Sequence, residues 1–200
     1  ILFCLDAIQT LGAFPTAADT IDFLAGDAHK WLLGPCAAGI LYVRRELQDR
    51  LQPSLLGWHN VRCPSFVAQE EIVLRRDARR YEAGSQNLMG LAGLRAALEL
   101  ILELGVDAIA TELLRKRAWL VPALVAKGCE VLEADAPAGN ASSIVSFEKS
   151  GEDLAALHER LEKAGIISSI RADRSGRKYV RLSPDFYNTD EELGRVLEFL

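Results

Sequence analysis

Three short apolar runs near the start of this chain constrain its fold more than any other feature. They cover residues 1–5, 21–25 and 39–43, and each lacks helical spacing and is bounded by polar or glycine residues. Such runs predict β-strands that are buried on two faces of a sheet. The connecting segments 10–20 and 27–38 are too short for long crossover helices, so neighbouring strands can pair antiparallel within an otherwise parallel sheet. The sequence therefore predicts an α/β fold.

The pattern becomes helical after residue 87. Leucines recur at helical spacing from residue 88 to a stop at Gly105, with Ser85 or Asn87 available as the cap, and a second helical run stops at Gly128. The remaining residues alternate between short apolar runs and amphipathic segments, which predicts a compact α+β module. We therefore expect a portion of a large domain with a connecting helix over residues 1–105, and a small α+β domain over 106–200. The strands of the small domain are expected at 129–132, 143–147, 166–170 and 179–182.

Composition excludes several classes of protein. Lysine and arginine number 23 and acidic residues 28, so the net charge of −5 offers no cationic excess for nucleic acid. No run approaches the roughly 20 apolar residues that a membrane-spanning helix needs. The three histidines lie far from metal-ligand spacing, so we expect no metal. The cysteines at positions 4, 36, 63 and 129 are widely separated, which favours a reducing cytoplasm.

The first apolar run begins at the first residue, Ile1. A strand buried on both sides needs backbone partners on both sides, and a domain seldom starts with one unprotected. We therefore expect a fragment that lacks its amino-terminal part and is inactive alone.

The segment Asp6-Ala7-Ile8-Gln9 places an acid at the end of the first predicted strand and an amide three residues later. Ligands bind at the carboxyl ends of strands in open α/β sheets. A carboxylate there can hold a heterocyclic nitrogen protonated, and the amide can donate to a neighbouring oxygen. The alternative is that Asp6 only caps the turn that follows.

A lysine follows the second predicted strand, in the segment Asp27-Ala28-His29-Lys30-Trp31. Partial desolvation at this position would favour the neutral amine and make Lys30 a nucleophile toward an aldehyde. The alternative is that Lys30 extends past Trp31 into solvent.

Two further segments carry polar groups that suit anions. Ser85, in Arg80-Tyr81-Glu82-Ala83-Gly84-Ser85, lies just before the predicted long helix, where a hydroxyl and free backbone N–H groups can bind a phosphate or simply cap the helix. Arg181 lies in a half-buried predicted strand and precedes Ser183-Pro184. Its planar guanidinium suits a substrate carboxylate, although an internal ion pair is equally compatible with the sequence.

Together, in this order, these segments resemble the class V aminotransferases. That broad group also includes cysteine desulfurases, selenocysteine lyases, kynureninases and isopenicillin-epimerase-like proteins, and the resemblance covers essentially all 200 residues. It implies a fold type I enzyme that depends on pyridoxal 5'-phosphate (PLP). It also implies a homodimer with shared active sites and a reaction at the Cα of an amino acid or amine.

The resemblance also implies a role for each candidate residue. Lys30 would form the internal Schiff base with the cofactor, Asp6 would pair with the pyridine nitrogen, and Gln9 would bond the phenolic oxygen. His29 would contact the phosphate, Ser85 would reach the phosphate of the neighbouring subunit, and Arg181 would take the substrate carboxylate.

The sequence leaves the reaction open among transamination, elimination and epimerisation. Desulfurases of this group use a cysteine on the loop before the carboxylate-binding arginine, and residues 167–177 contain none. A selenocysteine lyase or desulfurase that uses another thiol stays an alternative, as does a catalytically silent dimerising or binding relative. Cys36 follows Pro35 near the predicted site, where a buried filler is the expected role. The arginines of the 171–177 loop are expected either to bind a second acidic group or to face water.

Overall fold

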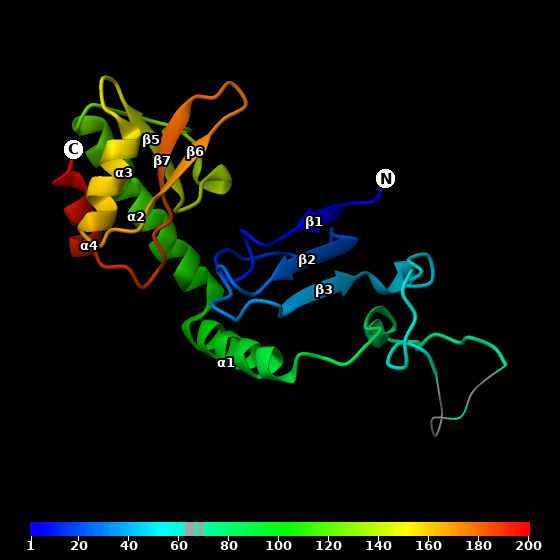
Figure 1. Cartoon of the computed structure of the whole chain (residues 1–200). Helices are drawn as coiled ribbons and strands as arrows, with labels where there is room; N and C mark the ends of the chain where they lie inside the picture. Colours follow the sequence, from blue (N-terminus) through cyan, green and yellow to red (C-terminus); the bar gives the residue numbers. More distant parts are fainter. Residues whose placement is uncertain (63–66, 68–69) are drawn as a thin grey trace. The chain divides into compact units, whose positions relative to one another are not determined.

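A computed structural model describes residues 1–62, 67 and 70–200 of the chain (Figure 1). Cys63 therefore lies outside the described residues. The chain forms two compact units, Ile1–Val106 and Asp107–Leu200. Each unit is described by itself.

The first unit contains a three-stranded mixed sheet in the order β1-β2-β3. The strands are β1 (Cys4–Asp6), β2 (Phe23–Asp27) and β3 (Gly39–Val43). β1 and β2 are parallel with Asp6 opposite Ala25, and β2 and β3 are antiparallel with Asp27 opposite Gly39. The predicted combination of parallel and antiparallel neighbours is confirmed. Two short 3-10 helices follow, η1 (Arg45–Leu47) and η3 (Ala78–Tyr81).

Burial of this sheet differs from the prediction. The small core beneath it consists of Ala7, Ile21 and Leu24 with partly buried neighbours. β1 is largely exposed and β3 alternates between exposed and half-buried positions, so the prediction that these strands are buried on two faces is wrong for this unit. β1 is the edge strand of the sheet and pairs only with β2 among the described residues, so its outer side stays open.

Helix α1 (Leu88–Leu104) follows the sheet, and its ends have clear chemical causes. The side chain of Asn87 accepts a hydrogen bond from the backbone N–H of Gly90 at 3.0 Å, so Asn87 rather than Ser85 is the N-cap. Gly105 has a φ of +83°, a left-handed conformation that only glycine adopts without strain, and it ends the helix. The predicted start and stop of this helix are both confirmed.

The second unit packs three helices on one face of a four-stranded antiparallel sheet (Figure 1). Its core joins Leu120 and Leu124 of the first helix to inward-facing strand residues such as Phe147 and Val180, which are fully buried. The sheet has the order β4-β5-β7-β6. The elements are α2 (Val106–Ala126), β4 (Cys129–Val131), η4 (Ala138–Asn140), β5 (Val145–Lys149), α3 (Leu154–Lys163), β6 (Ser169–Ala172), β7 (Lys178–Leu182) and α4 (Asp190–Leu197).

A lysine is buried in this second unit. Lys116 is 1% exposed, and its Nζ donates to the carboxylate of Glu112 and, at 2.9 Å, to the carbonyl oxygen of Phe186. Hydrogen bonds from Arg115 and then Lys116 lower the pKa of Glu112 from 4.5 to about 2. Because the ionised form is stabilised in the folded state, this contribution to stability is present above pH 4.5 and is lost as the pH falls toward 2.

Replacing Glu112 by glutamine is therefore expected to destabilise the protein at neutral pH, because Lys116 keeps a buried charge without its carboxylate. The difference in unfolding free energy from the wild type should shrink as the pH falls from 4.5 toward 2. Urea unfolding at a series of pH values measures this difference. Glu103→Gln, at an exposed position of α1, is the matched control. A pH-independent difference would contradict the assignment.

Within the described ranges, none of the helices combines the length and apolar character needed to cross a membrane.

Candidate active site

The polar residues that follow β1 and β2 lie at one edge of the first sheet. The two strands run parallel and in register, so Asp6 at the end of β1 and Asp27 at the end of β2 both lie at the carboxyl ends of the strands. The segment that carries His29 and Lys30 follows Asp27 directly. The structure therefore confirms that the two strand ends share one edge, which is where ligands bind in α/β folds.

Asp6 caps the turn after β1 with one carboxylate oxygen. Its Oδ1 accepts a hydrogen bond from the backbone N–H of Ile8 at 3.1 Å. The side chain is exposed, and Oδ2 has no hydrogen-bond partner among the described residues. The capping role and a ligand role are therefore compatible, because each uses a different oxygen.

Gln9 is joined to the lysine segment by a side-chain hydrogen bond. The indole Nε1–H of Trp31 donates to Oε1 of Gln9 at 2.9 Å, across 22 positions of the sequence. An indole nitrogen can only donate, so the amide oxygen of Gln9 must face Trp31. This leaves the Nε2 amide group of Gln9 as a donor for another partner.

The backbone also holds these two segments close together. Gly12, with a φ of +87°, lies so near Trp31 that an added Cβ would come within 2.3 Å of the Trp31 carbonyl oxygen. A Cβ added at Gly34 would likewise come within 2.7 Å of the Cβ of the buried Ala28. A side chain at Gly12 or Gly34 would push the lysine segment away from its neighbours.

His29 is oriented by Asp27. The Nδ1 atom of His29 lies 3.3 Å from Oδ2 of Asp27, and both side chains are 38% exposed. The hydrogen bond with His29 is the main cause that lowers the pKa of Asp27 below its usual value of 3.8. Nε2 of His29 stays available to face a ligand.

Lys30 is exposed at this edge, so the predicted desolvation of its amine is wrong for this unit. The cause is its position: Lys30 follows the end of β2 in a turn, whereas the adjacent Trp31 is buried at 8% exposure. Desolvation of the Lys30 amine therefore needs a group that covers this edge of the sheet.

Ser85 and Cys36 lie in other exposed segments. Ser85 lies two residues before the helix cap Asn87 and makes no side-chain hydrogen bond to the described part of the chain. Cys36 is exposed in the turn before β3, so the prediction of a buried filler is wrong. The neighbouring Ala37 has a φ of +61°, and its carbonyl oxygen accepts a hydrogen bond from Asn87 at 3.3 Å.

Arg181 belongs to the second unit, where it lies on β7 between two serines. Ser146 of β5 and Ser169 of β6 are its register partners on either side. The residue is half-buried as predicted, and its buried Nε has no hydrogen-bond partner in the described structure. Burial, followed by the nearby charge of Arg171, lowers the pKa of Arg181 below its usual value. No carboxylate forms an ion pair with Arg181 in the described residues, so the internal ion pair considered above is not present there.

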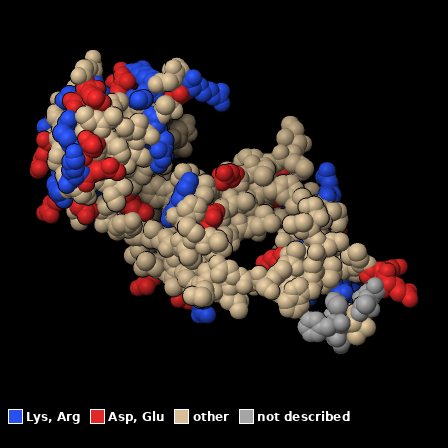
Figure 2. All heavy atoms as spheres, viewed as in Figure 1, with Lys and Arg blue, Asp and Glu red and all other residues tan. Residues whose placement is uncertain are grey.

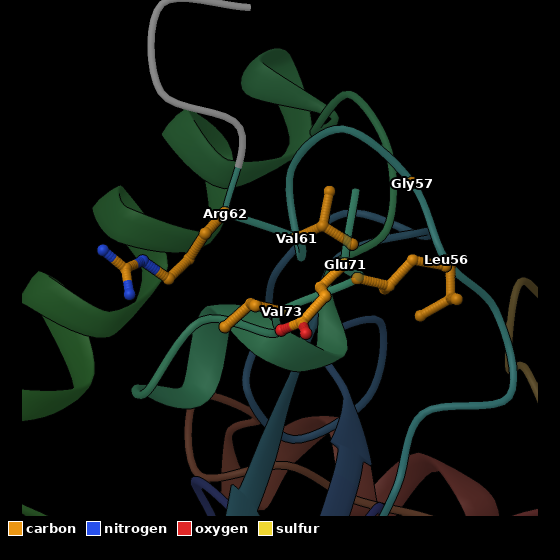
Figure 3. A pocket seen from close by; sticks show the side chains of 7 residues that line it. Leu56, Gly57, Val61, Arg62, Glu71 and Val73 are labelled. Carbon is orange, nitrogen blue, oxygen red and sulfur yellow. The ribbon is translucent and has the colours of Figure 1, made fainter. Parts of the chain in front are cut away.

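Two further pockets lie in the first unit. One of about 480 Å³ lies beside Asp27, Gly39 and Tyr81. A second, of about 290 Å³, is lined by residues 56–57, 61–62 and 71–73, most of them apolar (Figure 3). Arg62 extends away from the other lining side chains in this view, and Glu71 supplies a carboxylate to the lining.

Sequence reasoning missed two residues of the candidate site, Asp27 and Trp31. The Asp-x-His spacing before Lys30 was the available signal for Asp27. No sequence pattern pairs Trp31 with Gln9, because the contact depends on how two separate loops pack. Within the described residues, no group of three or more histidine, cysteine or acidic side chains is placed to hold a metal ion.

The first unit carries an acid, an amide and a lysine at one edge of a mixed α/β sheet. Comparison with known proteins identifies the family that has this arrangement. The model of the aminotransferase class-V family matches residues 1–196, and the chain belongs to that family. It is 28% identical over 199 residues to an uncharacterised aminotransferase, YcbU, of Bacillus subtilis. This alignment covers 98% of this chain and 50% of the relative. The chain spans about half the length of the curated relatives it matches.

Solved structures show the same fold. The apo structure of a cysteine desulfurase from Thermococcus onnurineus matches with a TM-score of 0.87 and 24% identity, over 98% of this chain and 51% of that chain. A C-DES variant with glycine covalently linked to its PLP cofactor matches with a TM-score of 0.81 and 22% identity, over 95% and 49%. The predicted family and fold, that of PLP-dependent enzymes, are therefore confirmed.

Proposed function

We propose that the protein carrying this chain is a PLP-dependent enzyme that acts at the Cα of an amino acid or amine, as an aminotransferase, a lyase or an epimerase. The observation that carries this proposal is the Gln9–Trp31 hydrogen bond, because it ties the acid-and-amide segment after β1 to the lysine segment after β2. The family match and the likeness to a PLP-linked structure support the same cofactor.

The residues present fit PLP by the chemistry of their free atoms. Asp6 keeps one carboxylate oxygen for a protonated pyridine nitrogen, and the Nε2 group of Gln9 is a donor for the phenolic oxygen. His29 keeps Nε2 for the phosphate while Asp27 holds its other nitrogen.

Each residue then has a distinct task. PLP, when bound, supplies an electron sink for a bond broken at the substrate Cα. Lys30 would hold the cofactor through its amine and would carry the proton to or from Cα. Arg181 binds the substrate carboxylate, which fixes the bond that is broken.

A homodimer with shared active sites is part of the proposal, with Ser85 binding the phosphate of the neighbouring subunit. Exposed apolar side chains of α1, such as Met89 at 88% and Leu102 at 73% exposure, support an interface with another chain. On the face shown in Figure 2, charged side chains crowd the second unit, while the first is largely uncharged. We also propose a cytoplasmic location, which the free thiols of the described cysteines, Cys4, Cys36 and Cys129, support.

Cysteine desulfuration is the second candidate, favoured by the likeness to a cysteine desulfurase. The segment 167–177 contains no cysteine, so a desulfurase would need another thiol, and Cys36 is an exposed one. A silent dimerising relative is the remaining alternative.

Labelling of the full-length protein tests the proposal. PLP is added, the visible absorbance of the bound cofactor is recorded, borohydride is applied, and the modified peptide is mapped by mass. We expect the label on Lys30. A folded protein with neither absorbance nor label would refute the enzyme function and favour the binding relative.

Trp31→Phe tests the role of the Gln9 contact. This change keeps an aromatic ring but removes the indole N–H, so the Gln9 amide is no longer held in the orientation that leaves Nε2 free. The Kd for PLP should therefore rise by roughly 3- to 10-fold, which corresponds to the free energy of one hydrogen bond. Equilibrium binding followed by cofactor absorbance measures it. Trp119→Phe on α2, a 38% exposed site, should leave the Kd unchanged. Wild-type affinity in Trp31→Phe would show that the contact does not position Gln9.

A further inference from the structure

The sheet of the second unit has one face without helices. Val145, Phe147, Val180 and Leu182 face the helix-covered core. Because side chains alternate along strands, the residues between them face the other way. The opposite face therefore presents the row Ser146, Arg181 and Ser169, and next to it the pair Tyr179 and Arg171.

The arginines of the 171–177 loop have different environments. Arg177 is neutralised by two carboxylates: its Nε lies 2.9 Å from Glu148 and its Nη2 lies 2.7 Å from Glu130. Arg174 is exposed in the turn between β6 and β7, which Asp173 closes. Arg177 also reaches the face of Arg181, because its guanidinium lies over the ring of Tyr179 at 5.6 Å. Arg171 is the arginine of this loop that lies on that face without a carboxylate partner.

Arg171 and Arg181 are diagonal neighbours on this face, since Arg181 is opposite Ser169 and Arg171 follows two residues later on β6. Such neighbours lie within reach of long side chains. Arg171 donates one hydrogen bond, to the carbonyl oxygen of Ile170 at 2.9 Å, and neither arginine has a carboxylate partner in the described part of the chain. Glu148, an acid of β5, is already held by Arg177.

Arg181 also opens onto a cavity of about 460 Å³. Its polar lining includes the hydroxyl residues Ser169 and Ser183 and the cation Arg195. The carboxylate of the lining, Glu192, is engaged with the N–H of Thr189 at 2.9 Å as part of the cap of α4. The cavity therefore presents the guanidinium groups of Arg181 and Arg195 together with the carboxylate of Glu192, and Arg171 is not part of its lining.

Two close guanidinium groups without carboxylates are mutually destabilising, and a ligand with two negative groups would neutralise both. We propose that Arg171 and Arg181 together bind a substrate with two acidic groups, with the α-carboxylate on Arg181 and the side-chain acid on Arg171. This assignment rests on the proposed function for Arg181 and names the substrate class as acidic amino acids.

Equilibrium binding of two unreactive probes to the full-length protein tests this assignment. Succinate carries two carboxylates and butyrate carries one on the same number of carbons. We expect succinate to bind at least about tenfold more tightly than butyrate, because it alone engages both guanidinium groups. Arg171→Gln should lower the affinity for succinate to that for butyrate and leave butyrate unchanged. Arg171→Lys, which keeps the charge without the planar fork, should be intermediate.

Arg174→Gln is the matched control, because it removes the same charge from the same loop without touching the face of Arg181. Equal affinities of the wild type for succinate and butyrate would overturn the proposal. A loss of succinate affinity in Arg174→Gln as large as that in Arg171→Gln would also overturn it. Thermal unfolding of each variant identifies those that do not fold. Because the probes need no cofactor, a missing PLP label refutes the proposed function, whereas missing succinate selectivity refutes only the second acidic site.

Discussion

Replacing Lys30 by alanine is expected to abolish covalent attachment of PLP and to lower turnover by about 10³-fold or more. Lys30 has two tasks in the proposed function, to attach the cofactor and to move the proton at Cα, and alanine can perform neither. The measurement is borohydride labelling followed by peptide mapping, combined with turnover on a panel of amino acids. Because Lys30 is exposed, its removal leaves no cavity, and stability should be almost unchanged.

Lys127→Ala is the control for this variant. Lys127 is exposed at the end of α2, so its loss removes the same charge from the second unit. A Lys30→Ala protein that keeps the label would assign the attachment to another lysine. If the wild type and Lys30→Ala both bind a partner protein and neither binds PLP, the result would support the hypothesis of a catalytically silent binding relative.

The sequence predicted those parts of the fold that depend on local chemistry. Residues 39–43 form β3 as expected, and Gly105 and Gly128 follow the two long helices with φ angles of +83° and +79°. The prediction failed where apolar character alone was used. Residues 166–170 were expected to form a strand, but β6 begins at Ser169, because Ile166 packs against the core while Ile167 is 93% exposed in the loop.

The candidate site shows the same division. Asp6 and Lys30 were placed at strand ends by sequence alone, and parallel pairing of β1 with β2 brings those ends to one edge. The bond between Gln9 and Trp31 spans 22 residues and requires the close approach of Gly12, which no periodicity encodes. The exposure of Lys30 likewise depends on what packs over it, which the residue type does not specify.

Phe147→Ala is expected to destabilise the second unit by about 3–5 kcal/mol, because it removes an aromatic ring from a close-packed core. Phe147 is fully buried, lies opposite Val180 on β7, and belongs to the cluster that α2, α3 and α4 cover. Urea unfolding of the full-length protein, followed by hydrogen exchange of the second unit, measures the loss. Ile167→Ala removes an apolar side chain that is 93% exposed and should change stability by no more than about 0.5 kcal/mol.

The same variant separates stability from recognition, because β5 presents its residues alternately to two faces. Phe147 points to the helices, whereas its neighbour Ser146 lies beside Arg181 on the open face. Molecules of Phe147→Ala that are still folded should therefore keep the affinity ratio of succinate to butyrate. Loss of that ratio at a temperature where the variant is folded would show that core packing sets the arginine geometry. An unchanged ratio would show that strand register alone is sufficient to hold Arg171 and Arg181 together.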